Sequence, residues 1–91
     1  MPTRVVHVRK EEFDIYIGRA FAEFAESEWH NPFRIRPGFG RKEVIQEFKA
    51  YLLAHPELMV KLKDVKGKTL GCWCKPKACH GDVIAELADL C

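Results

Sequence analysis

Cysteine is absent from the first 71 residues of this 91-residue chain, and arginine is absent from the last 50. Three of the four cysteines fall within eight positions, whereas small secreted scaffolds spread theirs along the chain to build a disulfide framework. This distribution argues against a disulfide-stapled fold and favours metal ligation or thiol chemistry near the C-terminus. The arginines of the N-terminal half are the better candidates for planar contacts with phosphate or carboxylate groups.

Excess charge and long apolar runs are also scarce. The chain has 15 basic and 13 acidic residues, a formal net charge of +2, which is too small to imply binding to nucleic acid or an anionic membrane. No apolar run is long enough for a transmembrane helix. Met1 leads into a strand-like segment rather than into the apolar region of a signal peptide, so we expect a cytoplasmic protein.

The composition that is present is typical of a folded globular protein. Hydrophobic residues make up 47% of the chain, and six Phe, two Trp and two Tyr supply large core side chains. A chain of 91 residues is long enough for one hydrophobic core and too short for two. We therefore expect a single domain over residues 1–91.

The hydrophobic pattern predicts alternating strands and helices. Strands are expected at 3–9, 13–17 and 68–74, and helices at 20–27, 41–54, 57–63 and 79–90, with a long loop over 29–40. The last helix is expected to bury Val83, Ile84, Leu87 and Leu90. The third strand should lie beside the first, reached by a helical crossover. The predicted fold is α/β: a small single domain with a short, mostly parallel or mixed sheet and helices packed on it.

The segment 71–82, which reads Gly-Cys-Trp-Cys-Lys-Pro-Lys-Ala-Cys-His-Gly-Asp, carries most of the candidate chemistry. It lies where the third strand should end and the last helix begin, and ligands of open α/β sheets bind at the carboxyl ends of strands. A helix N-terminus and nearby cations favour the thiolate of Cys79, which we predict to be the most reactive thiol and the nucleophile. His80 would do acid–base work, and Gly81 belongs to the N–H groups that would bind the ligand. The carboxylate of Asp82 either interacts favourably with the positive end of the helix dipole or orients His80.

Two other interpretations of the same cysteines stay open. Cys72, Cys74, Cys79 and His80 form a donor set that suits tetrahedral zinc. The spacing weakens this reading, because residues 72 and 74 of a strand project about 6.6 Å apart, further than two thiolates on one zinc. The third interpretation is that the cysteines are buried core residues. Our preferred interpretation has no cofactor, and zinc is the alternative.

A second group of residues is suited to holding an anion. Gly18 follows the second predicted strand and permits close approach of a ligand, and Arg19 next to it would reach an anion at the same sheet edge. Asn31 lies in an Asn-Pro turn motif, and Arg36 lies in a glycine-bordered loop that enters a helix. That loop matches neither the dinucleotide fingerprint nor a Walker A sequence.

Five motifs together resemble a known family. They are Val6-His7-Val8-Arg9, Tyr16-Ile17-Gly18-Arg19, Asn31-Pro32-Phe33, Gly71-Cys72-Trp73-Cys74 and Cys79-His80-Gly81-Asp82. In this order they are similar to DUF4326, a domain family of unknown function found in bacteria and their phages, and the cysteine-rich block is the most specific part. The segment 20–29 departs from the family, in which Pro usually follows the Arg and Trp-Gly precedes Asn-Pro-Phe. The resemblance implies that these motifs occur together and implies no reaction.

These observations predict a domain that binds, or acts on, a nucleotide-like or phosphorylated small ligand at the Cys-His-Gly-Asp turn. They do not decide whether the chain is an enzyme. The alternative is a zinc-stabilised module that binds a protein or nucleic-acid partner through exposed Trp29, Phe33 and Trp73. Neither hypothesis involves a membrane.

Overall fold

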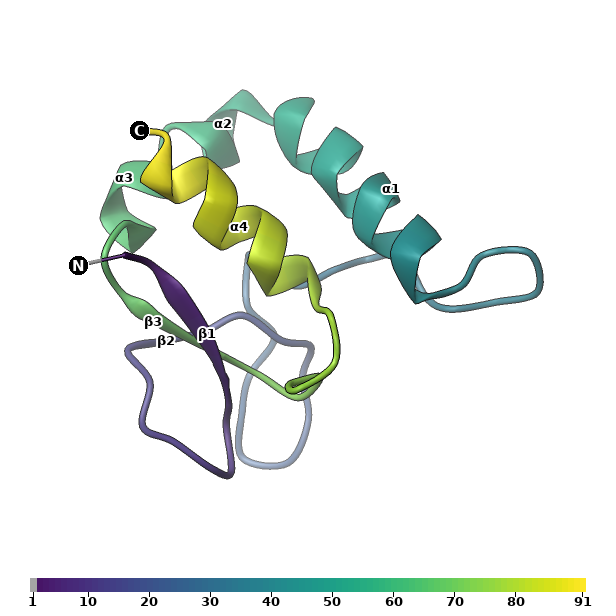
Figure 1. Cartoon of the computed structure of the whole chain (residues 1–91), viewed down its shortest axis with the longest axis horizontal. Helices are drawn as coiled ribbons and strands as arrows, with labels where there is room; N and C mark the ends of the chain where they lie inside the picture. The colour runs from purple at the N-terminus through teal and green to yellow at the C-terminus, as the bar shows by residue number, and fades with distance from the viewer. Residues whose placement is uncertain (1) are drawn as a thin grey trace.

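A three-stranded parallel sheet forms the base of the fold. The computed structural model describes residues 2–91. Its elements are β1 (Arg4–His7), β2 (Ile15–Tyr16), α1 (Arg41–Leu53), α2 (Pro56–Met59), α3 (Leu62–Val65), β3 (Thr69–Cys72) and α4 (His80–Asp89). The strand order is β1-β3-β2, and both pairings with β3 are parallel (Figure 1). The α/β class and the pairing of the third predicted strand with the first are therefore confirmed.

Helix α4 connects the sheet to the other helices. It contacts β1, α1 and α3, and Figure 1 shows it running above the sheet with α1 beyond it. Ile84 and Ala88 of α4 are fully buried, as are Leu70 of β3 and Phe48 of α1. One core therefore lies between the sheet, α4 and α1. No helix in residues 2–91 is long and apolar enough to cross a membrane.

The boundaries of α1 follow from its sequence. Gly40 is the N-cap, and its backbone N–H donates to the Glu43 carboxylate at 2.8 Å. Pro56 ends the helix, because the residue before a proline is disfavoured in the helical region. Val44, Phe48 and Leu52, which are spaced four residues apart on one face of α1, are buried.

The segment 20–27, predicted to be a helix, is not one. Phe21 and Phe24 form an antiparallel bridge, with Ala22 between them at a φ of 54°. The Phe24 ring stacks on Tyr16 at 4.5 Å between centroids and meets the Trp73 indole edge-on at 6.0 Å. A helix this short is marginal by itself, so these aromatic contacts to β2 and the residue after β3 decide its conformation.

Three smaller expectations are also corrected. The single helix predicted at 57–63 is divided into the two short turns α2 and α3. The third strand ends at Cys72 rather than at Cys74. Leu90 is 77% exposed, and Ala88 takes its place in the core, because α4 ends at Asp89 and buries positions four apart.

Candidate functional site

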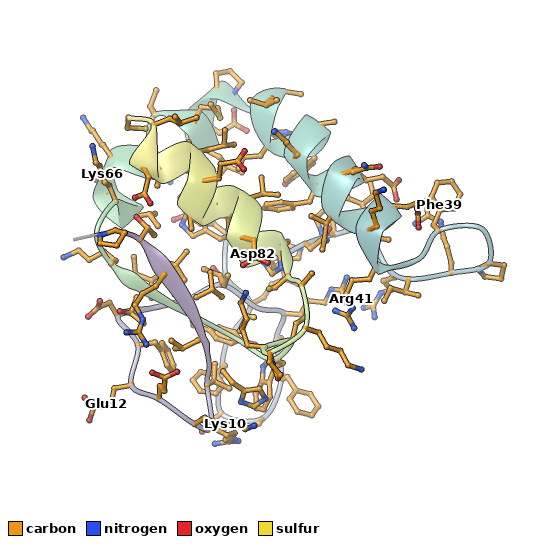
Figure 2. All side chains as sticks on the ribbon, in the orientation of Figure 1. Lys10, Glu12, Phe39, Arg41, Lys66 and Asp82 are labelled. Atoms are coloured by element: carbon orange, nitrogen blue, oxygen red, sulfur yellow. The ribbon has the colours of Figure 1, made fainter. Side chains whose placement is uncertain are left out.

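A cavity of about 700 Å³ lies at the carboxyl ends of the parallel strands. It is lined by most of the residues predicted to form a site, including the alternative metal ligands: Gly18, Arg19, Asn31, Cys72, Cys74, Cys79 and His80. The sheet explains this convergence: β2 and β3 run parallel, so the segments that leave them emerge at the same edge. Figure 2 shows Arg41 and Asp82 in the first turns of α1 and α4, the two helices that begin beside this edge.

Gly18, two residues after the end of β2, lies against the side chain of Tyr16 from the same strand. A Cβ at this position would lie 2.4 Å from the hydroxyl oxygen of Tyr16, so a side chain is excluded unless the Tyr16 ring moves. The same hydroxyl donates to the Arg19 carbonyl at 2.5 Å and accepts from the Trp73 indole N–H at 2.8 Å. The Tyr16 ring therefore occupies the space that a side chain at position 18 would need.

Arg19 and Asn31 build the cavity wall. The Arg19 guanidinium donates to the Asn31 carbonyl from Nε at 3.0 Å and from Nη2 at 2.7 Å, and Nη2 also reaches the Phe33 carbonyl at 2.9 Å. Burial, and then the charge of Arg34, lower the pKa of Arg19. The buried Asn31 side chain donates to the Val44 carbonyl at 3.3 Å and accepts from the Phe33 N–H at 2.9 Å. Asn31 holds the loop after Trp29 against α1, and Arg19 joins the same loop to the segment that follows β2.

Arg36, which the sequence suggested as an anion ligand, does not line the cavity. Its guanidinium stacks over the Phe39 ring at 3.8 Å and pairs with Glu47 at 3.1 Å. Figure 2 shows Phe39 on the loop that extends beyond the start of α1. The Glu47 carboxylate and the Phe39 ring therefore hold Arg36 outside the site.

Arg34 and Arg41, which border the same glycine-containing loop in the sequence, line the cavity instead. Arg41 is the first residue of α1 and donates to the Ala78 carbonyl at 3.1 Å, across the mouth of the site. Arg34 is exposed and makes no side-chain hydrogen bond or ion pair within residues 2–91. For Arg41 a signal existed, because a helix N-terminus that faces a sheet edge is itself an anion site.

Three thiols lie together in the cavity wall. The sulfurs of Cys72, Cys74 and Cys79 are all within 4.8 Å of one another, and those of Cys72 and Cys79 are 2.9 Å apart. Cys79 is the N-cap of α4, as predicted, and its sulfur accepts the Gly81 N–H at 3.3 Å. Cys91 is exposed at the end of the chain.

The neighbouring thiols shift the pKa values of Cys79 and Cys74 in opposite directions. The neighbouring Cys72 thiol, the Cys74 thiol and burial raise the pKa of Cys79 far above its ordinary value. Hydrogen bonds from Cys72 and Cys79, with Arg41 nearby, lower the pKa of Cys74 instead. Only one of three adjacent sulfurs ionises readily, and the outermost one is the least desolvated. The burial of Cys79 argues against a readily formed thiolate at this position, and its reactivity stays a prediction.

His80 is buried between the sheet and α1. Its Nε2 lies 2.9 Å from the Ile17 carbonyl, which only accepts, so Nε2 carries the proton and Nδ1 keeps a lone pair. Nδ1 lies 3.5 Å from the Cys79 sulfur. Burial is the main cause of the lowered pKa of His80, which keeps the ring neutral. The Phe48 ring packs edge-on against the imidazole at 4.9 Å.

Asp82 and Gly81 lie outside the cavity lining. The Asp82 carboxylate accepts the Cys79 N–H at 3.0 Å and pairs with Lys75 at 2.6 Å, so it caps α4 and does not contact His80. A Cβ at Gly81 would lie 2.6 Å from the Ile17 Cδ1, which shows how closely α4 approaches the sheet. These two residues position the turn that carries Cys79 and His80.

The cavity has positive charge and aromatic walls. Arg19, Arg34 and Arg41 line it, and its lining contains no Asp or Glu. Phe21, Phe33 and Trp73 supply flat apolar surface. Trp29, considered as an exposed partner-binding residue, is only 4% exposed and belongs to the core. Chemically, the site can accept an anionic group together with a planar or apolar body.

Comparison with known proteins identifies relatives of unknown function. Residues 3–90 match the family model described as "Domain of unknown function (DUF4326)". The chain is 32% identical over 89 residues to "Uncharacterized protein R718" of Acanthamoeba polyphaga mimivirus, covering 85% of this chain and 68% of that protein. It is 33% identical over 90 residues to the "Uncharacterized 12.4 kDa protein in nrdA-td intergenic region" of Enterobacteria phage T4, covering 94% of this chain and 77% of that one. No solved structure matches the chain.

Proposed function

This chain belongs to the DUF4326 family, which has no assigned activity, and from its site we propose that it binds a nucleotide-like or phosphorylated small molecule. The observation that carries the proposal is a cavity of about 700 Å³ lined by three arginines and by no carboxylate. Small-molecule sites in proteins commonly measure 300–1,000 Å³ and combine apolar walls with a few polar groups. The volume therefore suits a nucleotide or a sugar phosphate.

One of the three arginines is engaged within the protein, and the other two are free to contact a ligand. Arg19 donates three hydrogen bonds to the carbonyls of Asn31 and Phe33, so its main role is to hold the cavity wall and to add positive charge. Arg34 and Arg41 are the groups that would contact the anion, because Arg34 has no partner within residues 2–91 and Arg41 makes a single bond to a carbonyl. Planar guanidinium groups suit phosphate, and charge-assisted hydrogen bonds are the stronger kind.

The aromatic wall supports a planar group in the ligand. Phe21 is 63% exposed and meets the Trp73 ring edge-on at 5.2 Å between centroids. Stacking on such rings stabilises a nucleobase by about 1–3 kcal/mol. A nucleoside monophosphate combines both features, a planar base for Phe21 and Trp73 and a phosphate for Arg34 and Arg41.

Binding, rather than covalent catalysis at Cys79, is the function that the geometry favours. Cys79 is 1% exposed, and its neighbouring thiols and burial raise its pKa. Thiol nucleophiles react as thiolates and need access to their substrate. The roles predicted for Cys79, His80 and Asp82 as a nucleophile with acid–base partners are therefore not part of this proposal.

Two arginines two positions apart provide a matched test. Arg34 lines the cavity and Arg36 does not, although both are exposed residues of the same loop. Melting temperatures would be measured for wild type, Arg34→Ala and Arg36→Ala with nucleoside monophosphates, the corresponding nucleosides, inorganic phosphate and sodium chloride at matched ionic strength. A ligand that binds only the folded state raises the melting temperature by mass action, roughly 4–8 °C for each kcal/mol in a domain of this size.

We expect the phosphate-bearing ligands to stabilise wild type and Arg36→Ala by more than the nucleosides do. Arg34→Ala should weaken binding by about tenfold or more, because one hydrogen bond to a charged group contributes about 1.5–3 kcal/mol. Equal shifts with nucleosides and nucleotides would remove the anion from the proposal. Equal loss in the two arginine variants would show that the cavity is not where the ligand binds.

A further inference from the structure

The structure removes the objection that strand spacing raises to a metal at the cysteine cluster. That objection assumed that Cys72 and Cys74 both lie in a strand, which would hold their side chains about 6.6 Å apart. In the structure β3 ends at Cys72, and the chain then bends so that the Cys74 N–H reaches the Cys72 sulfur at 3.4 Å. The bend brings the Cys74 sulfur back to within 4.8 Å of the other two.

The sulfur separations lie within about 1 Å of those around one tetrahedral ion. Zinc binds thiolate at about 2.3 Å, so two thiolates on one zinc lie about 3.8 Å apart. The three sulfurs here lie within 4.8 Å of one another, and the closest pair, Cys72 and Cys79, is at 2.9 Å. Adjustments of about 1 Å in side-chain position would equalise the three distances around an ion. We propose that Cys72, Cys74 and Cys79 bind a zinc ion in the wall of the cavity.

Two of the three sulfurs, those of Cys72 and Cys79, are held by different elements of the fold. Cys72 is the last residue of the central strand, and Cys79 is the N-cap of α4. The Gly81 N–H points at the Cys79 sulfur and the Cys74 N–H at the Cys72 sulfur, and such bonds stabilise thiolates as they do the ligands of structural metal sites. The cluster is therefore anchored on the sheet and on a helix terminus, which is the rigid support that a metal site needs.

His80 offers a nitrogen donor beside Cys79, although the group of donor atoms that all lie within 4.8 Å of one another contains only the three cysteines. Its Nε2–H is bound to the Ile17 carbonyl, which is the second interaction that metal-binding histidines usually make and which leaves Nδ1 free to bind an ion. Nδ1 lies 3.5 Å from the Cys79 sulfur, and a nitrogen and a sulfur on one zinc lie about 3.6 Å apart. A ligand set of three thiolates is typical of soft metal ions rather than of magnesium or calcium.

The zinc site is compatible with the proposed anion site and independent of it. Zinc with three thiolates has a net charge of −1, so the three arginines would leave the cavity with a net charge of +2. The zinc content is measured without any phosphate ligand, and Arg34→Ala should retain zinc. Failure of one proposal therefore leaves the other standing.

The test compares two cysteine variants with wild type. Protein is purified under reducing conditions, loaded with zinc, freed of excess metal and assayed by elemental mass spectrometry; a second sample is loaded with cobalt and its absorption spectrum recorded. Cys74→Ser removes one proposed ligand at a half-buried position, so it is the variant least disruptive to the fold. Cys91→Ser is the matched control, since Cys91 is exposed and outside the cluster.

We expect about one zinc per chain in wild type and in Cys91→Ser, with the thiolate-to-cobalt charge-transfer band and the visible bands of tetrahedral cobalt. Cys74→Ser should lose most of its zinc to a chelator and show a weaker charge-transfer band, while its circular dichroism spectrum stays folded. Three results each overturn the proposal. They are no retained zinc in wild type, equal retention in Cys74→Ser, and a Cys72–Cys79 disulfide in the reduced preparation, seen as the loss of two hydrogens in the intact mass.

Discussion

At the scale of single residues, the contacts of Asp82 show whether it is a helix cap or a catalytic group. Its carboxylate receives the Cys79 N–H and pairs with Lys75, and these are its side-chain contacts in residues 2–91. An acid at this position satisfies a helix N–H that has no partner within the helix and lies at the positive end of the helix dipole. The contacts of Asp82 are therefore those of a helix cap.

We predict that Asp82→Ala destabilises the fold by about 1 kcal/mol, the usual cost of losing a helix cap. That change lowers the melting temperature by roughly 4–8 °C in a domain of this size. Glu86→Ala is the control, since Glu86 lies on the same helix in an exposed pair with Lys49 and should change stability little. A normal melting temperature with a lost response to nucleotides would return Asp82 to the binding site.

At the scale of elements, one carboxylate ties the two ends of the chain together. Asp89, at the end of α4, accepts from both the backbone N–H of Thr3 at 3.1 Å and its hydroxyl at 2.7 Å. The same Thr3 hydroxyl accepts the Gly67 N–H at 2.8 Å, in the turn before β3. The start of β1, the start of β3 and the end of α4 therefore depend on one small network.

This network predicts how stability changes with pH. Hydrogen bonds from Thr3 lower the pKa of Asp89 in the folded state, so the unfolded chain binds the proton more readily. The stabilisation is present above the unfolded pKa and is lost as the pH falls through the folded pKa. We expect Asp89→Asn to lose less stability than wild type between about pH 5 and pH 2 in urea titrations.

Thr3→Val is the control for the Asp89 prediction, because it removes the hydroxyl and keeps the backbone N–H. Its pH dependence should fall between those of wild type and Asp89→Asn. If all three proteins lose stability in parallel as the pH falls, then Asp89 does not contribute to the acid sensitivity.

At the scale of the whole molecule, the stability of the fold depends on a small core. Phe48 is fully buried on α1, and its ring contacts His80 of the cavity wall. We predict that Phe48→Ala costs about 3–5 kcal/mol, from lost burial and the cavity left behind. Since domains are commonly stable by only 5–15 kcal/mol, this is a large share.

Urea unfolding measures the cost of Phe48→Ala, and Leu53→Ala is the matched control. Leu53 lies on the same helix and is 53% exposed, so its loss should cost well under half as much. If the two variants are equally stable, then the face of α1 that carries Phe48 does not form the core.

Much of the site was predictable because the chemistry follows from the topology. Strand 68–74 was expected beside the first strand, and parallel strands present their carboxyl ends at one edge. Together with the parallel pairing of β2 and β3, which the structure adds, that rule brings Gly18, Arg19, Cys79 and His80 to one edge, and all four line the cavity. The start of α4 at residue 80 was equally local, since Cys79 and Asp82 have the spacing of a helix cap.

Side-chain direction and long-range contacts account for the wrong predictions. Arg34 and Arg36 are the same residue type two positions apart in one loop. Only the location of Glu47 and Phe39 decides that Arg36 turns away from the cavity. The phenylalanines of segment 20–27 have the spacing of an amphipathic helix. Their rings nevertheless contact Tyr16, which precedes the segment, and Trp73, which is distant in the sequence, and these contacts hold the segment in a non-helical conformation.

The sequence by itself determined the α/β class, the caps of α1 and α4, and the edge at which the site forms, because each of these depends on backbone geometry and on neighbours within a few residues. Only the tertiary structure decided which thiols are buried and how close the three sulfurs lie. Both depend on the bend after β3, and the 4.8 Å cluster forms only when the strand end and the helix start are brought together. Burial is a property of the folded chain, so no spacing of cysteines along the sequence determines it.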